Sequence, residues 1–195
     1  MNLPNVLTLA RLGITAFFVA SISLDFPWHF TVALVLFLVA TLTDYLDGEI
    51  ARCRNLITDF GKLMDPLADK ILTASAFICL IPLGAIPAWA VIIIISREFL
   101  ITGLRLLASS KGIVLPAEKL GKHKTAWQMA TIIFFLGLLS LGEIFPRRPE
   151  LRQDVWTVGG WIFVTSWIFV TITVLLTLFS GFAYLWKNRN LLKAT

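Results

Sequence analysis

Charged residues are scarce in this chain, and cysteine is rarer still. Lys, Arg, Asp and Glu make up 15% of the 195 residues, whereas 57% are hydrophobic. Soluble domains contain about 25% charged residues on average. This composition excludes an ordinary soluble domain and indicates an integral membrane protein. The two cysteines, Cys53 and Cys79, have neither the spacing nor the predicted location of a disulfide pair.

The first apolar stretch lacks the basic residues that open a signal peptide. Ala20-Ser21 could pass for a cleavage site, but no basic cluster precedes the apolar residues, so we expect the segment to be retained. Pro4 and Asn5 are typical of a turn. We expect them to lead into a short interfacial helix and then into the first membrane span.

Apolar stretches of about 20 residues, the length that crosses the hydrocarbon core, recur along the chain. They predict six transmembrane helices, near residues 5–24, 28–47, 62–81, 86–108, 123–142 and 156–186. These stretches use nearly the whole sequence and leave no linker, internal repeat or low-complexity tract. We therefore expect an all-α integral membrane protein with a single domain over residues 1–195, and nothing in it suggests a nucleic-acid partner.

The positions of Lys and Arg predict the orientation, because positive charge is retained on the cytoplasmic side. With the N-terminus inside, all of the 17 Lys and Arg residues except Arg147, Arg148 and Arg152 fall in inner segments. Those three lie among acidic residues, so the last outer loop is close to neutral. Both termini are therefore predicted to be cytoplasmic.

Two pairs of acidic residues lie in or beside these apolar stretches. Asp44 and Asp47 are three residues apart near the inner end of the second span, and Asp65 and Asp69 are four apart at the start of the third. Each spacing places a pair on one helix face. Charges at such positions are costly and indicate a functional site. Oxygen ligands from two helices favour hard divalent cations such as Mg²⁺ or Mn²⁺, so we predict a two-metal site and not a single-loop calcium site.

The residues around the acids suit a phosphate ester. Gly48, Ala51 and Gly61 are small and allow a close approach to the backbone, although small residues alone more often serve helix packing. Arg52 offers a fixed cation with bidentate geometry for phosphate oxygens.

The combined pattern resembles a known family. Asp44-x₂-Asp47-Gly48-x₂-Ala51-Arg52-x₈-Gly61-x₃-Asp65-x₃-Asp69 matches the signature of the CDP-alcohol phosphatidyltransferases at every position. Other stretches are similar to the branch of that family that uses sn-glycerol 3-phosphate as acceptor. They are Pro4-Asn5-x-Leu7-Thr8-x₂-Arg11, Arg97-Glu98-Phe99 through Leu104-Arg105, and Gly121-Lys122-His123-Lys124-Thr125 followed by Gln128. The resemblance extends from about residue 3 to residue 130.

The resemblance implies transfer of a phosphatidyl group from CDP-diacylglycerol to sn-glycerol 3-phosphate, with release of CMP. It implies a homodimer in the bacterial cytoplasmic (inner) membrane, with the active site facing the cytoplasm. Asp44, Asp47 and Asp65 are then metal ligands for Mg²⁺ or Mn²⁺, and Asp69 is the general base with a share in metal binding. The expected CDP-diacylglycerol contacts are Asn5, Thr8, Gly48, Ala51, Arg52 and Gly61.

The acceptor carries a phosphate, and four inner basic residues are candidates to bind it. They are Arg97, Arg105, Lys122 and Lys124. Arg97 interrupts an apolar run and needs a partner or a water-filled cavity, so pairing with an acid is an equal alternative. Arg105 lies seven positions after Glu98, and a structural link between them is plausible. Lys122 and Lys124 begin the fifth span, where they also satisfy the topology rule.

Three other interpretations stay open. An intramembrane prenyltransferase binds magnesium and diphosphate with Asp-rich helices, although its motifs differ and it normally has more than six spans. A cation transporter could also use carboxylates from two helices, but we would expect them at mid-membrane. Within the family, the acceptor could instead be inositol phosphate, phosphatidylglycerol, serine or choline.

Overall fold

The computed structural model describes the backbone of residues 3–54, 59–110, 119–145 and 160–189. Side chains are described for residues 9–43, 68, 70–109, 121–145 and 160–189. Within these ranges the fold is all-α. The helices are α1 (Leu3–Ser23), α2 (His29–Arg54), α3 (Asp59–Leu80), α4 (Ala88–Ser110), α5 (Lys119–Ile144) and α6 (Trp161–Lys187).

Each helix overlaps one of the apolar stretches, but the start of α1 and the end of α2 differ from the prediction. α1 is a single helix from Leu3, so the predicted turn at Pro4 and Asn5 is wrong, whereas an interfacial location of its first turns stays a prediction. Pro4 is tolerated there because the first turn of a helix needs no backbone N–H donor. α2 continues to Arg54, beyond the predicted end at residue 47, so the first half of the acidic motif is helical.

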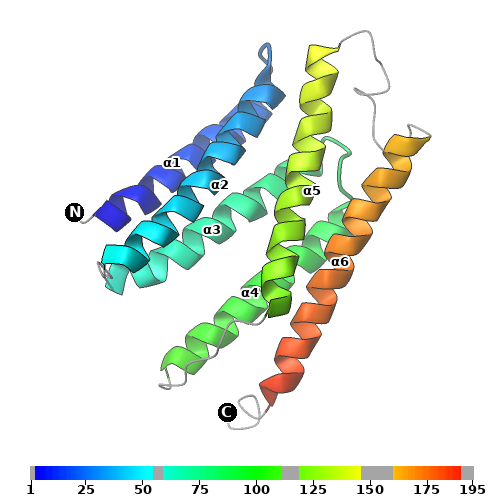
Figure 1. Ribbon diagram of the computed structural model, residues 1–195. Helices are drawn as coiled ribbons and strands as arrows, with labels where there is room; N and C mark the ends of the chain where they lie inside the picture. Colours follow the sequence, from blue (N-terminus) through cyan, green and yellow to red (C-terminus); the bar gives the residue numbers. More distant parts are fainter. Residues whose placement is uncertain (1–2, 55–58, 111–118, 146–159, 190–195) are drawn as a thin grey trace.

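Successive helices run in opposite directions and pack into one bundle (Figure 1). α1 packs against α2 and α3, α5 packs against α2 and α6, and α4 packs against α6. The core between the helices contains large aromatic side chains with almost no exposed surface, namely Phe18, Phe37, Phe77 and Phe135. Because successive helices alternate in direction, the starts of α1, α3 and α5 lie with the ends of α2, α4 and α6 at one end of the bundle.

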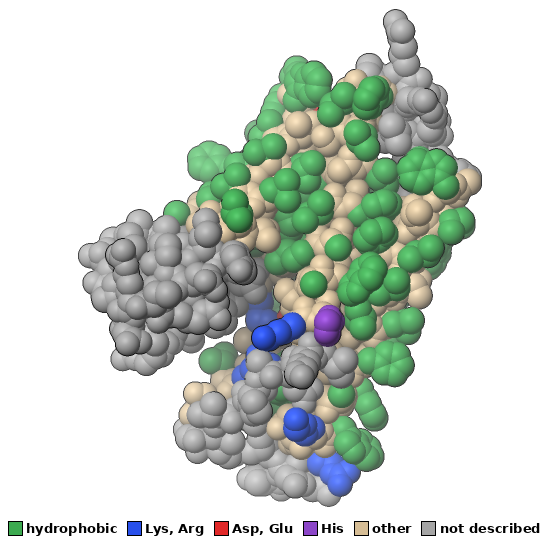
Figure 2. All heavy atoms as spheres, in the orientation of Figure 1, with side chains coloured by type: hydrophobic (Ala, Val, Ile, Leu, Met, Phe, Trp, Pro, Cys, Tyr) green, Lys and Arg blue, Asp and Glu red, His purple; other side chains and the backbone are tan. Residues whose placement is uncertain are grey.

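The outer surface of the bundle is strongly apolar. Phe17 and Phe179 have exposed fractions of 70% and 68%, and hydrophobic side chains cover much of the face in Figure 2. Soluble monomers rarely expose patches of this extent. Gly121–Ile144 and Trp161–Lys187 are each long and apolar enough to cross a bilayer. These features indicate a membrane location, whereas six spans and cytoplasmic termini remain predictions.

Several threonine hydroxyl groups inside the bundle form hydrogen bonds with other groups of the protein. The Thr131 and Thr173 hydroxyls form a hydrogen bond of 2.7 Å between α5 and α6. Thr15 and Thr177 donate to the carbonyl oxygens of residues one turn earlier, Arg11 and Thr173. Such bonds let threonine lie in an apolar environment without an unpaired polar group.

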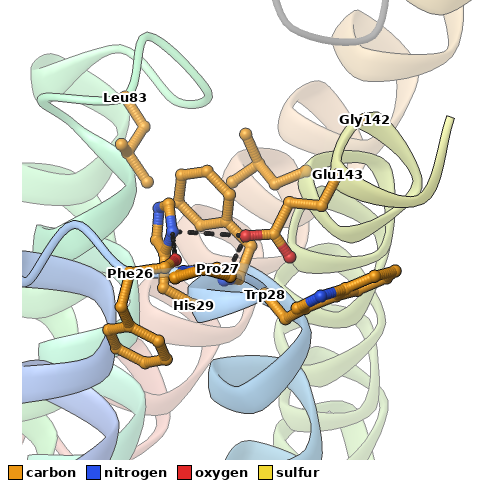
Figure 3. Close-up of a pocket in the computed structure, with 9 residues that line it drawn as sticks. Phe26, Pro27, Trp28, His29, Leu83, Gly142 and Glu143 are labelled. Atoms are coloured by element: carbon orange, nitrogen blue, oxygen red, sulfur yellow. Dashed lines mark hydrogen bonds and ion pairs between the residues drawn. The ribbon is translucent and has the colours of Figure 1, made fainter. Parts of the chain in front are cut away.

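The end of the bundle opposite the acidic motif is fixed by Glu143 of α5. Its carboxylate accepts hydrogen bonds of 2.9 Å from the backbone N–H groups of Phe30 and Thr31, and one of 2.8 Å from the Thr31 hydroxyl. It also lies 3.3 Å from Nδ1 of His29 (Figure 3). A carboxylate at this position satisfies the first N–H groups of α2 and complements its dipole.

A cavity of about 490 Å³ adjoins this contact. Phe26, Trp28, His29 and Glu143 are among its lining residues, whose side chains Figure 3 shows. The Glu143 oxygens already accept hydrogen bonds from α2. We therefore interpret Glu143 as a structural cap that holds α2 against α5.

Candidate active site

Both halves of the acidic motif lie at the same end of the bundle. Asp44 and Asp47 belong to the last turns of α2, and Asp65 and Asp69 to the first turns of α3. These two helix ends lie together in Figure 1. The side chains of the four acids are outside the described residues, as are those of Asn5, Thr8, Gly48, Ala51, Arg52 and Gly61. Convergence of the four carboxylates therefore stays a prediction.

A cluster of charged side chains adjoins the acidic motif, centred on Glu98 of α4. Lys70 of α3 donates to Glu98 Oε2 at 3.0 Å, and Arg97 Nη1 lies 3.3 Å from Oε1. Lys124 of α5 donates to the same Oε1. We call these four residues the Glu98 cluster. It joins α3, α4 and α5, and because Lys70 directly follows Asp69, it lies next to the acids along α3.

Burial explains why this cluster needs a carboxylate. Only 2% of the Lys124 side chain is exposed. An ammonium group removed from water is stable as a cation only when it is paired and hydrogen-bonded. Glu98 supplies that partner, so its charge allows three cationic side chains from three helices to lie close together.

Gln128 of α5 brings a further polar group to the same place. It is buried and lines a small cavity together with Lys70, Thr73 and Glu98. Within the described part of the chain, its Nε2 has no hydrogen-bond partner. A buried amide donor normally finds a partner, so a polar group of a ligand at this point would be stabilised.

Arg105 lies two turns further along α4 and contacts α6. Its Nε donates a hydrogen bond of 3.1 Å to the Tyr184 hydroxyl, and its guanidinium carbon lies 5.1 Å from the centre of the Tyr184 ring. The expected Glu98–Arg105 link is therefore wrong. α4 directs Glu98 toward α3 and α5, whereas the next two turns of α4 pack against α6.

The four basic residues predicted to bind the acceptor phosphate thus have different surroundings. Arg97 and Lys124 meet at Glu98, and Arg105 rests on Tyr184. Lys122 is exposed, and no described residue forms a hydrogen bond or ion pair with it. Figure 2 shows Lys and Arg side chains near this end of the molecule, away from the large apolar face.

Lys70, Gln128 and Tyr184 were missed as candidate site residues. Lys70 had a signal, because a cation directly after Asp69 is well placed to act with the motif. Gln128 belonged to a stretch that matched the family without an assigned role. Tyr184 lies far from the motif in sequence, and its contact with Arg105 arises only from helix packing. Among residues with described side chains, no three His, Cys, Asp or Glu groups are placed to hold a metal.

Comparison with known proteins agrees with the motif. Residues 1–179 match the CDP-alcohol phosphatidyltransferase family. A Bacillus subtilis (strain 168) protein named CDP-diacylglycerol–glycerol-3-phosphate 3-phosphatidyltransferase is 37% identical over 207 residues, covering 100% of this chain and 98% of that protein. A protein of the same name from Rickettsia bellii is 37% identical and covers 73% of this chain and 76% of its own length.

A further relative comes from Mycobacterium tuberculosis (strain H37Rv). It is named probable phosphatidylglycerophosphate synthase, and it is 34% identical over 94% of this chain and 80% of its own length. The family match covers most of the chain, and the acidic motif stands at the junction of α2 and α3. This chain belongs to the CDP-alcohol phosphatidyltransferase family.

Proposed function

We propose that this protein transfers the phosphatidyl group of CDP-diacylglycerol to sn-glycerol 3-phosphate, giving phosphatidylglycerophosphate and CMP. The observation that carries the choice of acceptor is the Glu98 cluster, which gathers cations from three helices beside the acidic motif. An acceptor with its own phosphate needs such cations. The names of the bacterial relatives support the same acceptor.

The motif acids fit a divalent metal, on which members of this family generally depend. Four carboxylates on two helices provide the hard oxygen ligands that Mg²⁺ and Mn²⁺ prefer. Asp44, Asp47 and Asp65, with a share from Asp69, would hold two ions. Bound there, the ions would offset the negative charge of the diphosphate and of the departing CMP.

The protein's own residues would bind and activate the substrates. Asp69 takes the proton of the acceptor 1-hydroxyl, whose oxygen attacks the phosphorus attached to diacylglycerol, and the bond from that phosphorus to CMP breaks. The diphosphate lies against the backbone at Gly48, Ala51 and Gly61 and pairs with Arg52. Asn5 and Thr8, in the first turns of α1, contact the nucleotide.

The acceptor phosphate would lie between the Glu98 cluster and Arg105. Arg97 and Lys124 approach it from α4 and α5, and Arg105 from the next turns of α4. Lys122, which is exposed, would attract the anion at the mouth of the site and contribute less to its binding. Gln128 lines a cavity of about 10 Å³ with Glu98 and Lys70, room for about one water molecule, so its amide would contact the acceptor through water.

The proposed setting is the bacterial cytoplasmic membrane. Six spans with both termini inside would place the acidic motif, the Glu98 cluster and Arg105 at the cytoplasmic interface. There the lipid donor keeps its acyl chains in the bilayer while its diphosphate meets a soluble acceptor. We propose that residues 1–195 form one catalytic domain and that the active form is a homodimer.

The test is CMP release by the purified protein with CDP-diacylglycerol and a panel of acceptors. The panel contains glycerol 3-phosphate, inositol phosphate, serine, choline and phosphatidylglycerol, each with and without Mg²⁺ or Mn²⁺. Release with glycerol 3-phosphate alone supports the proposal. Release with another acceptor contradicts the assigned substrate. Metal flux into proteoliposomes without CMP release would indicate a transporter, and turnover of a prenyl diphosphate would indicate a prenyltransferase.

A further inference from the structure

We infer that α6 sets the affinity for the acceptor, because Tyr184 and Gly181 position the two arginines of α4. This inference rests on the proposed function, in which Arg97 and Arg105 bind the acceptor phosphate. The family match ends at residue 179, so neither α6 residue belongs to the matched segment. Both are positioning residues that act through an arginine.

Tyr184 holds the guanidinium of Arg105. Tyr184 is 2% exposed, whereas Arg105 is exposed. The hydroxyl accepts a hydrogen bond from Nε, and the ring lies within cation–π distance of the guanidinium carbon. With Nε bound to the tyrosine, the outer nitrogens keep the planar edge that can bind two phosphate oxygens. A buried residue thus fixes the direction of an exposed one.

Gly181 sets the position of Arg97 by having no side chain. A Cβ atom added at this glycine would lie 3.0 Å from Cγ of Arg97 and 3.6 Å from its Nε. Five glycines elsewhere in the fold differ, since a Cβ at Gly13, Gly103, Gly121, Gly137 or Gly160 would meet nothing within 4 Å. The backbone of α6 therefore lies against the stem of Arg97, whose guanidinium reaches Glu98.

The two contacts belong to one helix interface. Gly181 and Tyr184 are three residues apart and share a face of α6. Ile101 and Leu104 of α4 lie between the arginines and form an apolar cluster with Tyr184. Because these apolar residues pack α4 against α6, both arginines of α4 are held at defined positions relative to Gly181 and Tyr184.

Tyr184→Phe tests the first contact, because it removes the hydroxyl and keeps the ring. We expect KM for glycerol 3-phosphate to rise by about 3- to 10-fold, the range for loss of one hydrogen bond. KM for CDP-diacylglycerol and kcat should stay within about twofold. The decisive measurement is the same substitution in an Arg105→Ala background, where it should change acceptor KM no further. Arg105→Lys, which has no Nε–H, replaces Arg105→Ala if that variant is too slow to assay.

Gly181→Ala tests the second contact, with Gly137→Ala of α5 as the matched control. The added methyl must displace the stem of Arg97, so acceptor KM should rise several-fold while donor KM is unchanged. Gly137→Ala meets no neighbour and should behave as wild type in both. Melting temperatures of all variants in detergent show whether each protein is folded.

Three results would overturn the inference. The first is an equal effect of Tyr184→Phe with and without Arg105, and the second is an equal rise of donor and acceptor KM in Tyr184→Phe; either would give Tyr184 only a structural role. The third is an unchanged acceptor KM in Gly181→Ala. Failure of the proposed function looks different, because wild-type protein then releases no CMP with glycerol 3-phosphate. Tyr184→Phe is then compared with and without Arg105→Ala, using the acceptor that does support CMP release.

Discussion

Lys124 at the start of α5 and Glu98 in α4 form an ion pair in which the lysine is almost fully buried. Glu98 also pairs with Lys70 and Arg97, so one carboxylate pairs with cations of α3, α4 and α5. Removal of one member of a buried ion pair costs more than the pair contributes, because the remaining charge is left uncompensated. Glu98 is therefore the most sensitive residue of the cluster.

Glu98→Gln should lower both stability and acceptor binding. Loss of the negative charge leaves three cations close together, and we expect a loss of about 3 kcal/mol in the free energy of unfolding. KM for glycerol 3-phosphate should rise at least about tenfold, since the cations repel and separate. Thermal melting in detergent and CMP-release kinetics measure the two effects. Glu98→Asp, which keeps the charge, should be milder, and a Glu98→Gln protein with normal melting and kinetics would contradict the role of Glu98.

Lys122 and Lys124 offer a matched pair of substitutions on one helix. Lys124→Ala removes a buried cation from Glu98, and we expect a rise of about tenfold or more in acceptor KM with a smaller change in donor KM. Lys122→Ala removes an exposed cation and should change acceptor KM by no more than about threefold at physiological salt. CMP release at varied acceptor and donor concentrations gives both constants. Equal effects of the two substitutions would mean that burial of Lys124 has no bearing on acceptor binding.

The six helices could be predicted from the sequence because each overlaps an apolar stretch bounded by polar residues. The acidic motif could also be located, since its spacings of three and four residues define helix faces without any knowledge of packing. The later end of α2 was missed because the prediction followed hydrophobicity. Helix hydrogen bonding continues through the polar residues from Asp47 to Arg54.

The partners of Glu98 and Arg105 could not be predicted in the same way. The two residues are seven positions apart, which suggested a link along one helix face. Apart from Arg97, their partners lie on other helices, with Lys70 and Lys124 separated from Glu98 by 28 and 26 residues and Tyr184 from Arg105 by 79. Periodicity determines which residues share a face, but the choice of facing helix depends on packing of the whole bundle.

Asp44→Asn and Asp65→Asn should each abolish CMP release. Each substitution keeps the size of the side chain and removes a charge that a divalent ion requires of its ligand. We expect kcat to fall by at least about 10³-fold, as for loss of a residue that acts in the transition state. Melting temperatures should stay close to wild type, because removal of repulsion among four acids offsets the loss of bound metal. Near-normal turnover in either variant would remove the proposed two-metal site.

Metal dependence provides a test that leaves the sequence unchanged. Removal of divalent ions with a chelator should stop CMP release, and added Mg²⁺ or Mn²⁺ should restore it. Metal binding should also raise the melting temperature of the wild-type protein in proportion to the logarithm of metal concentration above Kd. The same titration with Asp44→Asn should give a smaller shift. Full activity after exhaustive chelation would contradict the assignment of the four acids.

Glu143→Ala tests whether the two ends of the bundle act separately. The substitution removes the carboxylate that accepts from Phe30, Thr31 and the Thr31 hydroxyl. Loss of a helix cap costs about 0.5–2 kcal/mol, so the melting temperature should fall. KM for both substrates should stay at the wild-type value, because the acids and the Glu98 cluster lie at the other end of α2 and α5. Glu143→Gln keeps one acceptor oxygen, and its melting temperature should lie between those of the wild-type protein and Glu143→Ala. A rise in acceptor KM with either substitution would show that the cap at the start of α2 controls the geometry of the acidic motif at its end.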